Sequence, residues 1–77
     1  MEYIELELLT DEKVSYRYYP NGKEAFGIVS LMRETGKCVH DLPCPDAPSM
    51  FARQAWSRIK KYQREGEFPE RALVAWY

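Results

Sequence analysis

The sequence predicts an α+β protein: a two-layer sandwich in which an antiparallel meander is covered on one face by one helix, in the order ββββαβ. Segments near the start alternate between apolar and polar residues, which is the pattern of strands with one buried face. Turn-forming residues separate these segments, and a later stretch has helical periodicity instead. Because a half-apolar sheet needs a cover, the amphipathic helix is expected to pack on it.

The first two strands are predicted over residues 3–9 and 13–19, joined by a polar turn. A pairing that begins at Leu9 and Lys13 places apolar residues opposite one another on one face. The pairs are Leu8 with Val14, Leu6 with Tyr16 and Ile4 with Tyr18 on that face, and Glu5 with Arg17 and Tyr3 with Tyr19 on the other. Such cross-strand pairs contribute roughly 0.2–1 kcal/mol each. The apolar and the charge pattern therefore agree on one register.

Two turns set the expected register of the next two strands, over residues 25–32 and 37–42. Residues 20–22 have the Pro-Asn-Gly sequence of a type I turn followed by a left-handed glycine, and residues 34–36 follow the same design. The predicted pairs are Tyr16 with Phe26, Val14 with Ile28, Arg33 with Lys37, Cys38 with Met32, His40 with Ser30 and Leu42 with Ile28. The common face would then hold Ile4, Leu6, Leu8, Val14, Tyr16, Tyr18, Phe26, Ile28, Met32, Cys38 and Leu42.

The cover is predicted as a helix over about residues 48–65, ended by Gly66. At 100° per residue its apolar side chains fall within an arc of about 140°, which only Gln63 interrupts. The arc consists of Phe51, Ala52, Ala55, Trp56, Ile59 and Tyr62. Residues 72–77 are short, apolar and aromatic, so a fifth strand is expected there. The sequence leaves its place in the sheet open.

Size and composition limit the class of protein. With 77 residues, of which 45% are hydrophobic and 30% charged, the chain is expected to form one folded domain over residues 1–77. A net charge of -1 gives no overall attraction to nucleic acid or to an anionic membrane. The sequence has no apolar stretch of about 20 residues and no signal-peptide pattern at its start, so a cytoplasmic protein without membrane association is expected. It contains no phosphate-binding loop, and neither a cofactor nor an enzymatic role is expected.

Cys38, His40 and Cys44 are the candidates for a metal or thiol site. Cys38 and His40 are two residues apart on a strand and share a face, and thiolate and imidazole are zinc ligands. These three are all the cysteine and histidine residues in the chain, whereas a closed zinc site takes four ligands. The alternative is a small apolar cysteine and a core histidine bonded to the Ser30 hydroxyl. Cys44, between two prolines, is the better candidate for a nucleophile.

Two surfaces are candidates for binding. Opposite the apolar arc, the helix carries Arg53, Lys60, Lys61 and Arg64, and no acidic residue occurs in residues 49–64. Such a stripe can bind the phosphates of nucleic acid, or it can be an ordinary solvated helix face.

The second surface is the sheet face turned away from the helix, which is predicted to show Val29, Leu31 and Val39 together with Tyr3 and Tyr19. An exposed apolar patch usually marks an interface, although scattered surface hydrophobics are normal. The leading expectation is therefore a non-enzymatic interaction module that forms a homodimer through this face or an edge strand. The alternatives are a nucleic-acid-associated module that uses the basic helix face, and a small metal or thiol protein.

Several short segments point to relatives. The helical sequence Ala-Trp-Ser-Arg-Ile at 55–59 is followed by Gly-Glu-Phe-Pro-Glu at 66–70 and Val-Ala-Trp-Tyr at 74–77. The segments at 2–6 and 27–30 belong to the same pattern. Together they resemble small uncharacterised bacterial proteins of about this length. The shared motifs are structural and that group has no assigned activity, so the resemblance implies a bacterial single-domain protein and transfers no site residues.

Overall fold

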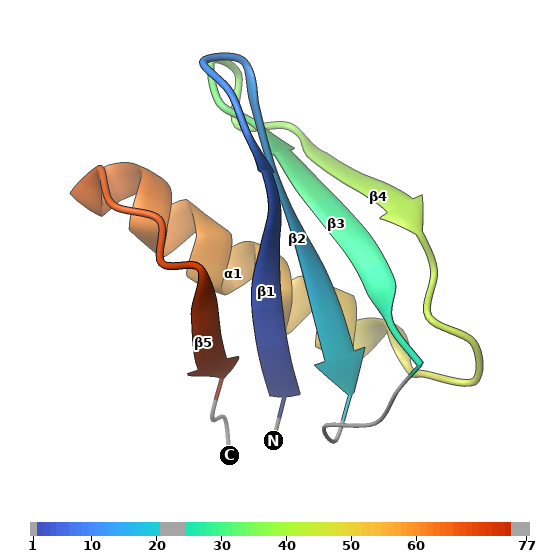
Figure 1. Ribbon diagram of the computed structural model, residues 1–77. Helices are drawn as coiled ribbons and strands as arrows, with labels where there is room; N and C mark the ends of the chain where they lie inside the picture. Colours follow the sequence, from blue (N-terminus) through green and yellow to red (C-terminus); the bar gives the residue numbers. More distant parts are fainter. Residues whose placement is uncertain (1, 21–24, 75–77) are drawn as a thin grey trace.

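A computed structural model describes residues 2–20 and 25–74, and these have the predicted α+β architecture. Five strands form one antiparallel sheet, and one helix packs across one of its faces (Figure 1). In chain order the elements are β1 (Glu2–Leu9), β2 (Lys13–Pro20), β3 (Gly27–Met32), β4 (Cys38–Leu42), α1 (Ser49–Glu65) and β5 (Arg71–Val74). The strand order β4-β3-β2-β1-β5 places the last strand at the edge beside β1. Residues 75–77 of the expected last strand lie outside the described residues.

The predicted pairing of β1 with β2 is confirmed over the first half of β1 and the second half of β2. The observed pairs are Tyr3 with Tyr19, Ile4 with Tyr18, Glu5 with Arg17 and Leu6 with Tyr16. A β-bulge after Leu6 then adds one residue to β1, so Leu8 lies opposite Ser15 and Leu9 opposite Val14. The expectation that Leu8 joins the core is therefore wrong, and its side chain is 44% exposed.

The predicted register of β3 against β2 is wrong by three residues. The observed pairs are Tyr16 with Val29, Val14 with Leu31 and Ser15 with Ser30. An odd shift turns every side chain of a strand to the other face. Val29 and Leu31 are consequently buried in the core, whereas Phe26 and Ile28, which were expected there, are only partly buried on the other side. The expected turn at 20–22 falls largely on residues 21–24, outside the described residues.

The predicted register of β4 against β3 is wrong by one residue over most of its length. The observed pairs are Cys38 with Leu31, Val39 with Ser30 and His40 with Val29, in place of Cys38 with Met32 and His40 with Ser30. A bulge at Asp41 then restores the predicted pair of Ile28 with Leu42. The turn before β4 has the expected left-handed glycine, since Gly36 has a φ of 77°. Cys38 therefore packs against the core as expected, and Met32 does not belong to it.

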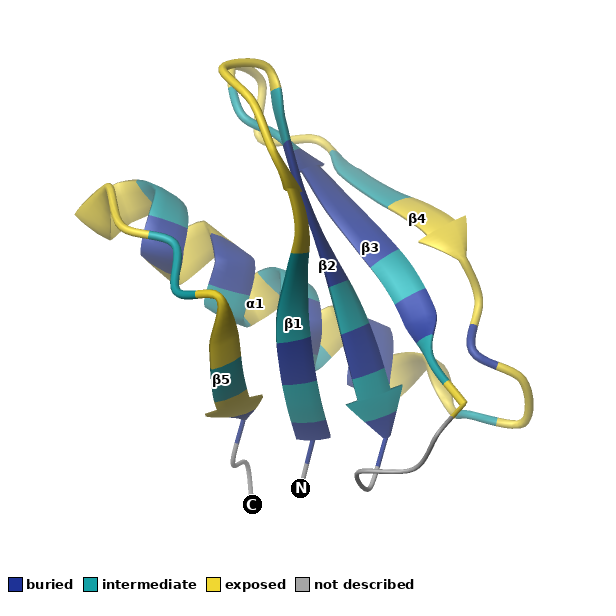
Figure 2. Cartoon of the chain, viewed as in Figure 1, coloured by how far each residue is buried: buried dark blue, intermediate teal, exposed yellow. Residues whose placement is uncertain are grey.

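The predicted apolar arc of α1 faces the sheet. Its buried members are Phe51, Ala52, Ala55, Ile59 and Tyr62, and Trp56 is partly buried beside them (Figure 2). They pack against a core formed by Ile4, Val14, Tyr16, Tyr18, Val29, Leu31 and Val74. Gly66 ends the helix as predicted, with a φ of 76° and its N–H donating to the carbonyl of Tyr62 at 2.8 Å.

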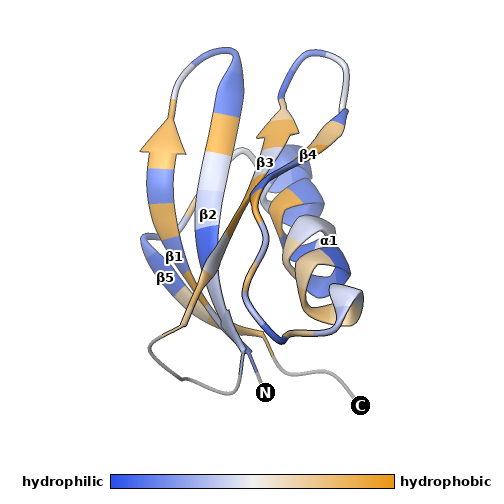
Figure 3. Cartoon of the chain, turned by 90° about the vertical axis from the view of Figure 1, so that its right-hand side faces the viewer, coloured by the Kyte–Doolittle hydropathy of each residue, from blue (hydrophilic) through white to orange (hydrophobic). Residues whose placement is uncertain are grey.

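The other face of the sheet has no layer on it. Figure 3 shows α1 along one side of the strands, and on the opposite side there is no helix or strand among residues 2–20 and 25–74. The segment that leads from α1 to β5 also lies on the helix side, because the Tyr16 hydroxyl, which points to that side, bonds the carbonyl of Pro69. We call the opposite side the uncovered face.

Candidate functional site

A row of apolar side chains crosses the uncovered face from β5 to the start of β3. Tyr3 lies opposite both Leu73 and Tyr19, and Phe26 packs on Tyr19 directly before β3. The ring centroids are 5.5 Å apart for Tyr3 and Tyr19 and 5.6 Å apart for Tyr19 and Phe26, in tilted arrangements favoured by aromatic pairs. Leu73 is 63% exposed at the end of the row. We call these four residues the aromatic band.

Further apolar residues lie on the uncovered face in β1, β3 and β4. They are Leu8, Ile28, Met32, Val39 and Leu42, all partly or largely exposed. Leu42, like Leu8, is 44% exposed. Single exposed hydrophobic residues are normal, whereas many apolar residues on one face are typical of an interaction surface.

The five residues predicted for an exposed patch divide between the two faces. Tyr3, Tyr19 and Val39 lie on the uncovered face and are partly exposed. Val29 and Leu31 are 0% and 1% exposed, so their assignment to that patch is wrong. The cause is the shift of β3 against β2, which exchanges its two faces.

Charged groups beside the aromatic band are paired. The Arg17 guanidinium donates to the Glu7 carboxylate and lies 4.7 Å from the centroid of the Phe26 ring. Arg71 and Glu5 form a second pair at 3.5 Å. Exposed ion pairs contribute little stability. Their effect here is to leave the uncovered face close to neutral, so two copies of it would not repel one another.

The centre of the uncovered face holds a chain of hydrogen bonds that the sequence analysis missed. The hydroxyls of Ser15 and Ser30 are 2.7 Å apart, and both residues are buried. The Ser30 hydroxyl donates to the Asp41 carboxylate, which also accepts from Lys13 Nζ at 3.4 Å. Because a carboxylate only accepts, Ser15 is the donor to Ser30. The expected bond between Ser30 and His40 is wrong, since the two side chains point to opposite faces.

The candidate metal ligands do not converge. His40 Nε2 lies 2.7 Å from the Tyr18 hydroxyl, and that oxygen also accepts the backbone N–H of Cys44 at 3.2 Å. Tyr18 thus holds His40 and the Cys44 backbone together, while the Cys44 sulfur lies 3.8 Å from the carbonyl of Pro45. In the part of the chain that the structure describes, no three His, Cys, Asp or Glu side chains form a group that could hold a metal ion.

The Cys44 thiol has the environment of an unreactive cysteine. It is 7% exposed, and burial raises the pKa of the thiol, with a further contribution from the Asp46 carboxylate. A nucleophilic cysteine needs the opposite shift, because the thiolate is the reactive form.

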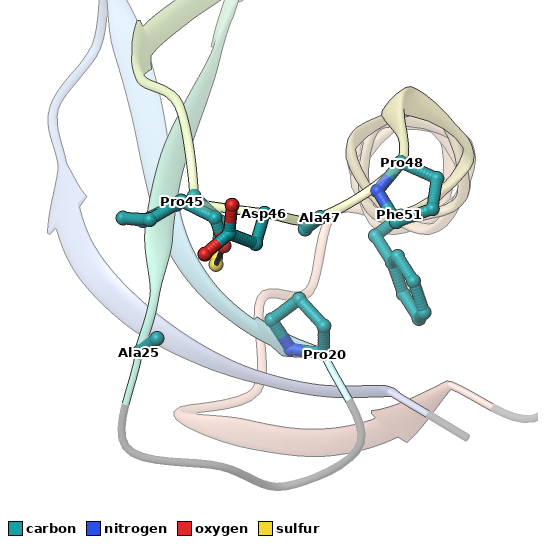
Figure 4. A pocket seen from close by; sticks show the side chains of 8 residues that line it. Pro20, Ala25, Pro45, Asp46, Ala47, Pro48 and Phe51 are labelled. Carbon is teal, nitrogen blue, oxygen red and sulfur yellow. Dashed lines mark hydrogen bonds between the residues drawn. The ribbon is translucent and has the colours of Figure 1, made fainter.

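A hollow of about 160 Å³ lies beside the Cys44 loop (Figure 4). It is lined by Pro20, Ala25, Cys44, Pro45, Asp46, Ala47, Pro48 and Phe51. Among the described residues of this lining, Asp46, with a φ of 58°, is the one with a charged side chain.

The four predicted cations of the helix all lie on its exposed surface. They are Arg53, Lys60, Lys61 and Arg64. Among the described residues, no carboxylate lies within ion-pair distance of any of them. They are therefore available to an anionic ligand, and the sequence alone was sufficient to find them because the helix is amphipathic.

Comparison with models of protein families, with curated proteins and with solved structures gives no match for this chain. The resemblance to small bacterial proteins therefore stays a prediction. Across the described residues, α1 is the one helix, and it is neither long nor apolar enough to span a bilayer.

Proposed function

We propose that the protein is a non-enzymatic interaction module that forms a homodimer through its uncovered face. The observation that supports this most is the aromatic band and its exposed leucines, on a sheet face that no described element covers. A chain of this size buries a modest share of its surface on folding, so additional burial against a partner stabilises it appreciably.

A second copy of the chain suits this surface in charge. Each of the three ion pairs on this face joins one carboxylate to one cation, so these pairs bring no net charge into a symmetric contact. In a two-fold dimer the same patch serves both subunits, so the aromatic band of each subunit would form part of the contact.

The experiment is a mass measurement by sedimentation equilibrium over micromolar concentrations. The expected mass is twice the 9.1 kDa of one chain. Leu73→Lys and Leu42→Lys place charges on exposed positions of the uncovered face, and each should shift the protein to monomer. Met50→Lys is the matched control, because Met50 is an exposed apolar residue on α1, and it should remain dimeric.

Two results would contradict the homodimer. One is a wild-type mass of one chain throughout the concentration range. The other is a loss of dimer in Met50→Lys equal to that in Leu73→Lys, which would move the interface to the helix layer.

A further inference from the structure

A second hollow lies on the opposite layer from the proposed dimer contact, between α1 and β4. Its volume is about 380 Å³, and it is lined by Cys38, Arg53, Trp56, Ser57 and Lys60. Arg53 and Lys60 are seven residues apart, which separates them by about 10.5 Å along the helix axis. Trp56 and Ser57 lie three and four residues after Arg53, so they occupy the same side of the helix between the two cations.

The Trp56 indole is held in a fixed orientation. Its Nε1–H donates to the backbone carbonyl of Ser30 at 3.0 Å, and the ring meets His40 edge-on with centroids 5.5 Å apart. It is nevertheless only partly buried and forms part of the hollow's wall. A ring that is already ordered loses little conformational freedom when a ligand stacks on it.

The cations around the hollow have no carboxylate partner among residues 2–20 and 25–74. Lys61 and Arg64 continue the positive surface beyond Lys60 along the same helix. Phosphate groups are therefore a better match than cationic or neutral ligands. The Ser57 hydroxyl adds a donor between the two ends of the hollow.

We propose that this hollow binds a segment of single-stranded nucleic acid. One base stacks on the Trp56 indole, and the phosphates on either side of that nucleotide contact Arg53 and Lys60. Single-strand binding sites combine these elements, an aromatic platform and a basic track for the backbone. A duplex keeps its bases stacked on one another and offers no free base to the indole. This site is separate from the dimer contact, so either proposal can fail alone.

The test is fluorescence anisotropy with labelled twelve-nucleotide oligothymidylate and oligouridylate, from about 50 mM salt upward. Wild-type protein should bind both single strands and bind a duplex of equal length at least ten-fold more weakly. Trp56→Leu should weaken binding about ten-fold, and Trp56→Phe, which keeps a ring, should restore most of the affinity.

The cations are tested by Arg53→Gln combined with Lys60→Gln, at two exposed positions where folding is not at risk. Because each phosphate contact on a single strand contributes about 0.7 to the slope of log affinity against log salt, the pair should reduce that slope by about 1.4. Lys37→Gln, an exposed cation away from the hollow, is the control for charge.

The proposal is overturned by any of four results. These are the absence of binding at low salt, equal affinity for duplex, an unchanged affinity in Trp56→Leu, and an equal loss per charge in Lys37→Gln.

Discussion

The hydroxyl of Tyr16 donates a hydrogen bond of 2.6 Å to the backbone carbonyl of Pro69, 53 residues further along the chain. The Tyr16 side chain is fully buried, and its ring also packs against Tyr62 of α1 with centroids 6.0 Å apart. One side chain in the middle of the sheet thereby fixes both the helix and the segment that returns from the helix to β5.

Tyr16→Phe should lower the free energy of unfolding by about 1–2 kcal/mol, because it leaves the carbonyl of Pro69 without its donor. Urea denaturation measures the change. Tyr3→Phe is the matched control, since the Tyr3 hydroxyl forms no hydrogen bond with the described residues, and it should stay within about 0.5 kcal/mol of wild type. Equal stability of Tyr16→Phe and wild type would show that the bond contributes nothing.

Stability should fall as the pH rises above 10. Burial raises the pKa of the phenols of Tyr16, Tyr18 and Tyr62 above the ordinary value of 10.0. Above pH 10 the unfolded chain loses these protons while the folded chain keeps them, so ionisation favours unfolding. Below that pH both states are protonated, and these groups leave stability unchanged. Urea titrations at a series of pH values should show a shallower alkaline decline in Tyr16→Phe, and identical declines would contradict this account.

Gly27→Ala should destabilise the protein by about 2–3 kcal/mol, which is the cost of overpacking a core. A Cβ at this position would overlap the ring of Tyr18. That ring cannot move aside easily, because its hydroxyl is bonded to His40 and to the Cys44 backbone. Thermal and urea unfolding measure the loss. In a Tyr18→Ala background the same change should cost far less, and equal costs in both backgrounds would exclude the clash.

Cys38 should react with iodoacetamide faster than Cys44 in the folded protein. Cys38 is partly exposed, whereas Cys44 is buried and burial raises the pKa of its thiol. Mass spectrometry of digested, partly alkylated protein gives the two rates, and in urea they should become equal. Faster reaction of Cys44 in the folded state would instead support the nucleophile that the sequence suggested.

The first two strands and the helix could be predicted because each has one apolar and one polar side. The third strand could not be oriented in this way. Residues 25–32 are apolar on both faces, with Val29 and Leu31 on one and Phe26 and Ile28 on the other. The predicted register of β3 against β2 therefore depended on the turn at residues 20–22 alone. The observed shift of three residues exchanged the two faces of β3. Pairing Ser15 with Ser30 was the available signal, since it lets two polar side chains bond one another.

The candidate surfaces also differ in how far the sequence could predict them. Tyr3 and Tyr19 were predictable from the confirmed pairing of β1 with β2. Placing Ile28 and Leu42 on the uncovered face required the correct register of β3 against β2. The basic helix face followed from periodicity, but the hollow beside Trp56 did not, because it needs β4 and α1 placed against each other. Gln63, the exception in the apolar arc, exchanges two hydrogen bonds with Arg33, a partner that periodicity does not reveal.

The edge strand β4 is poorly suited to pairing with the strand of a second molecule. β4 is five residues long, and its pairing with β3 is interrupted by an extra residue at Asp41. A neighbouring molecule that tried to extend the sheet sideways would find little regular backbone to follow, so growth into open-ended fibrils is discouraged. In the proposed dimer the contact is made through the uncovered face instead, and a single partner occupies that face.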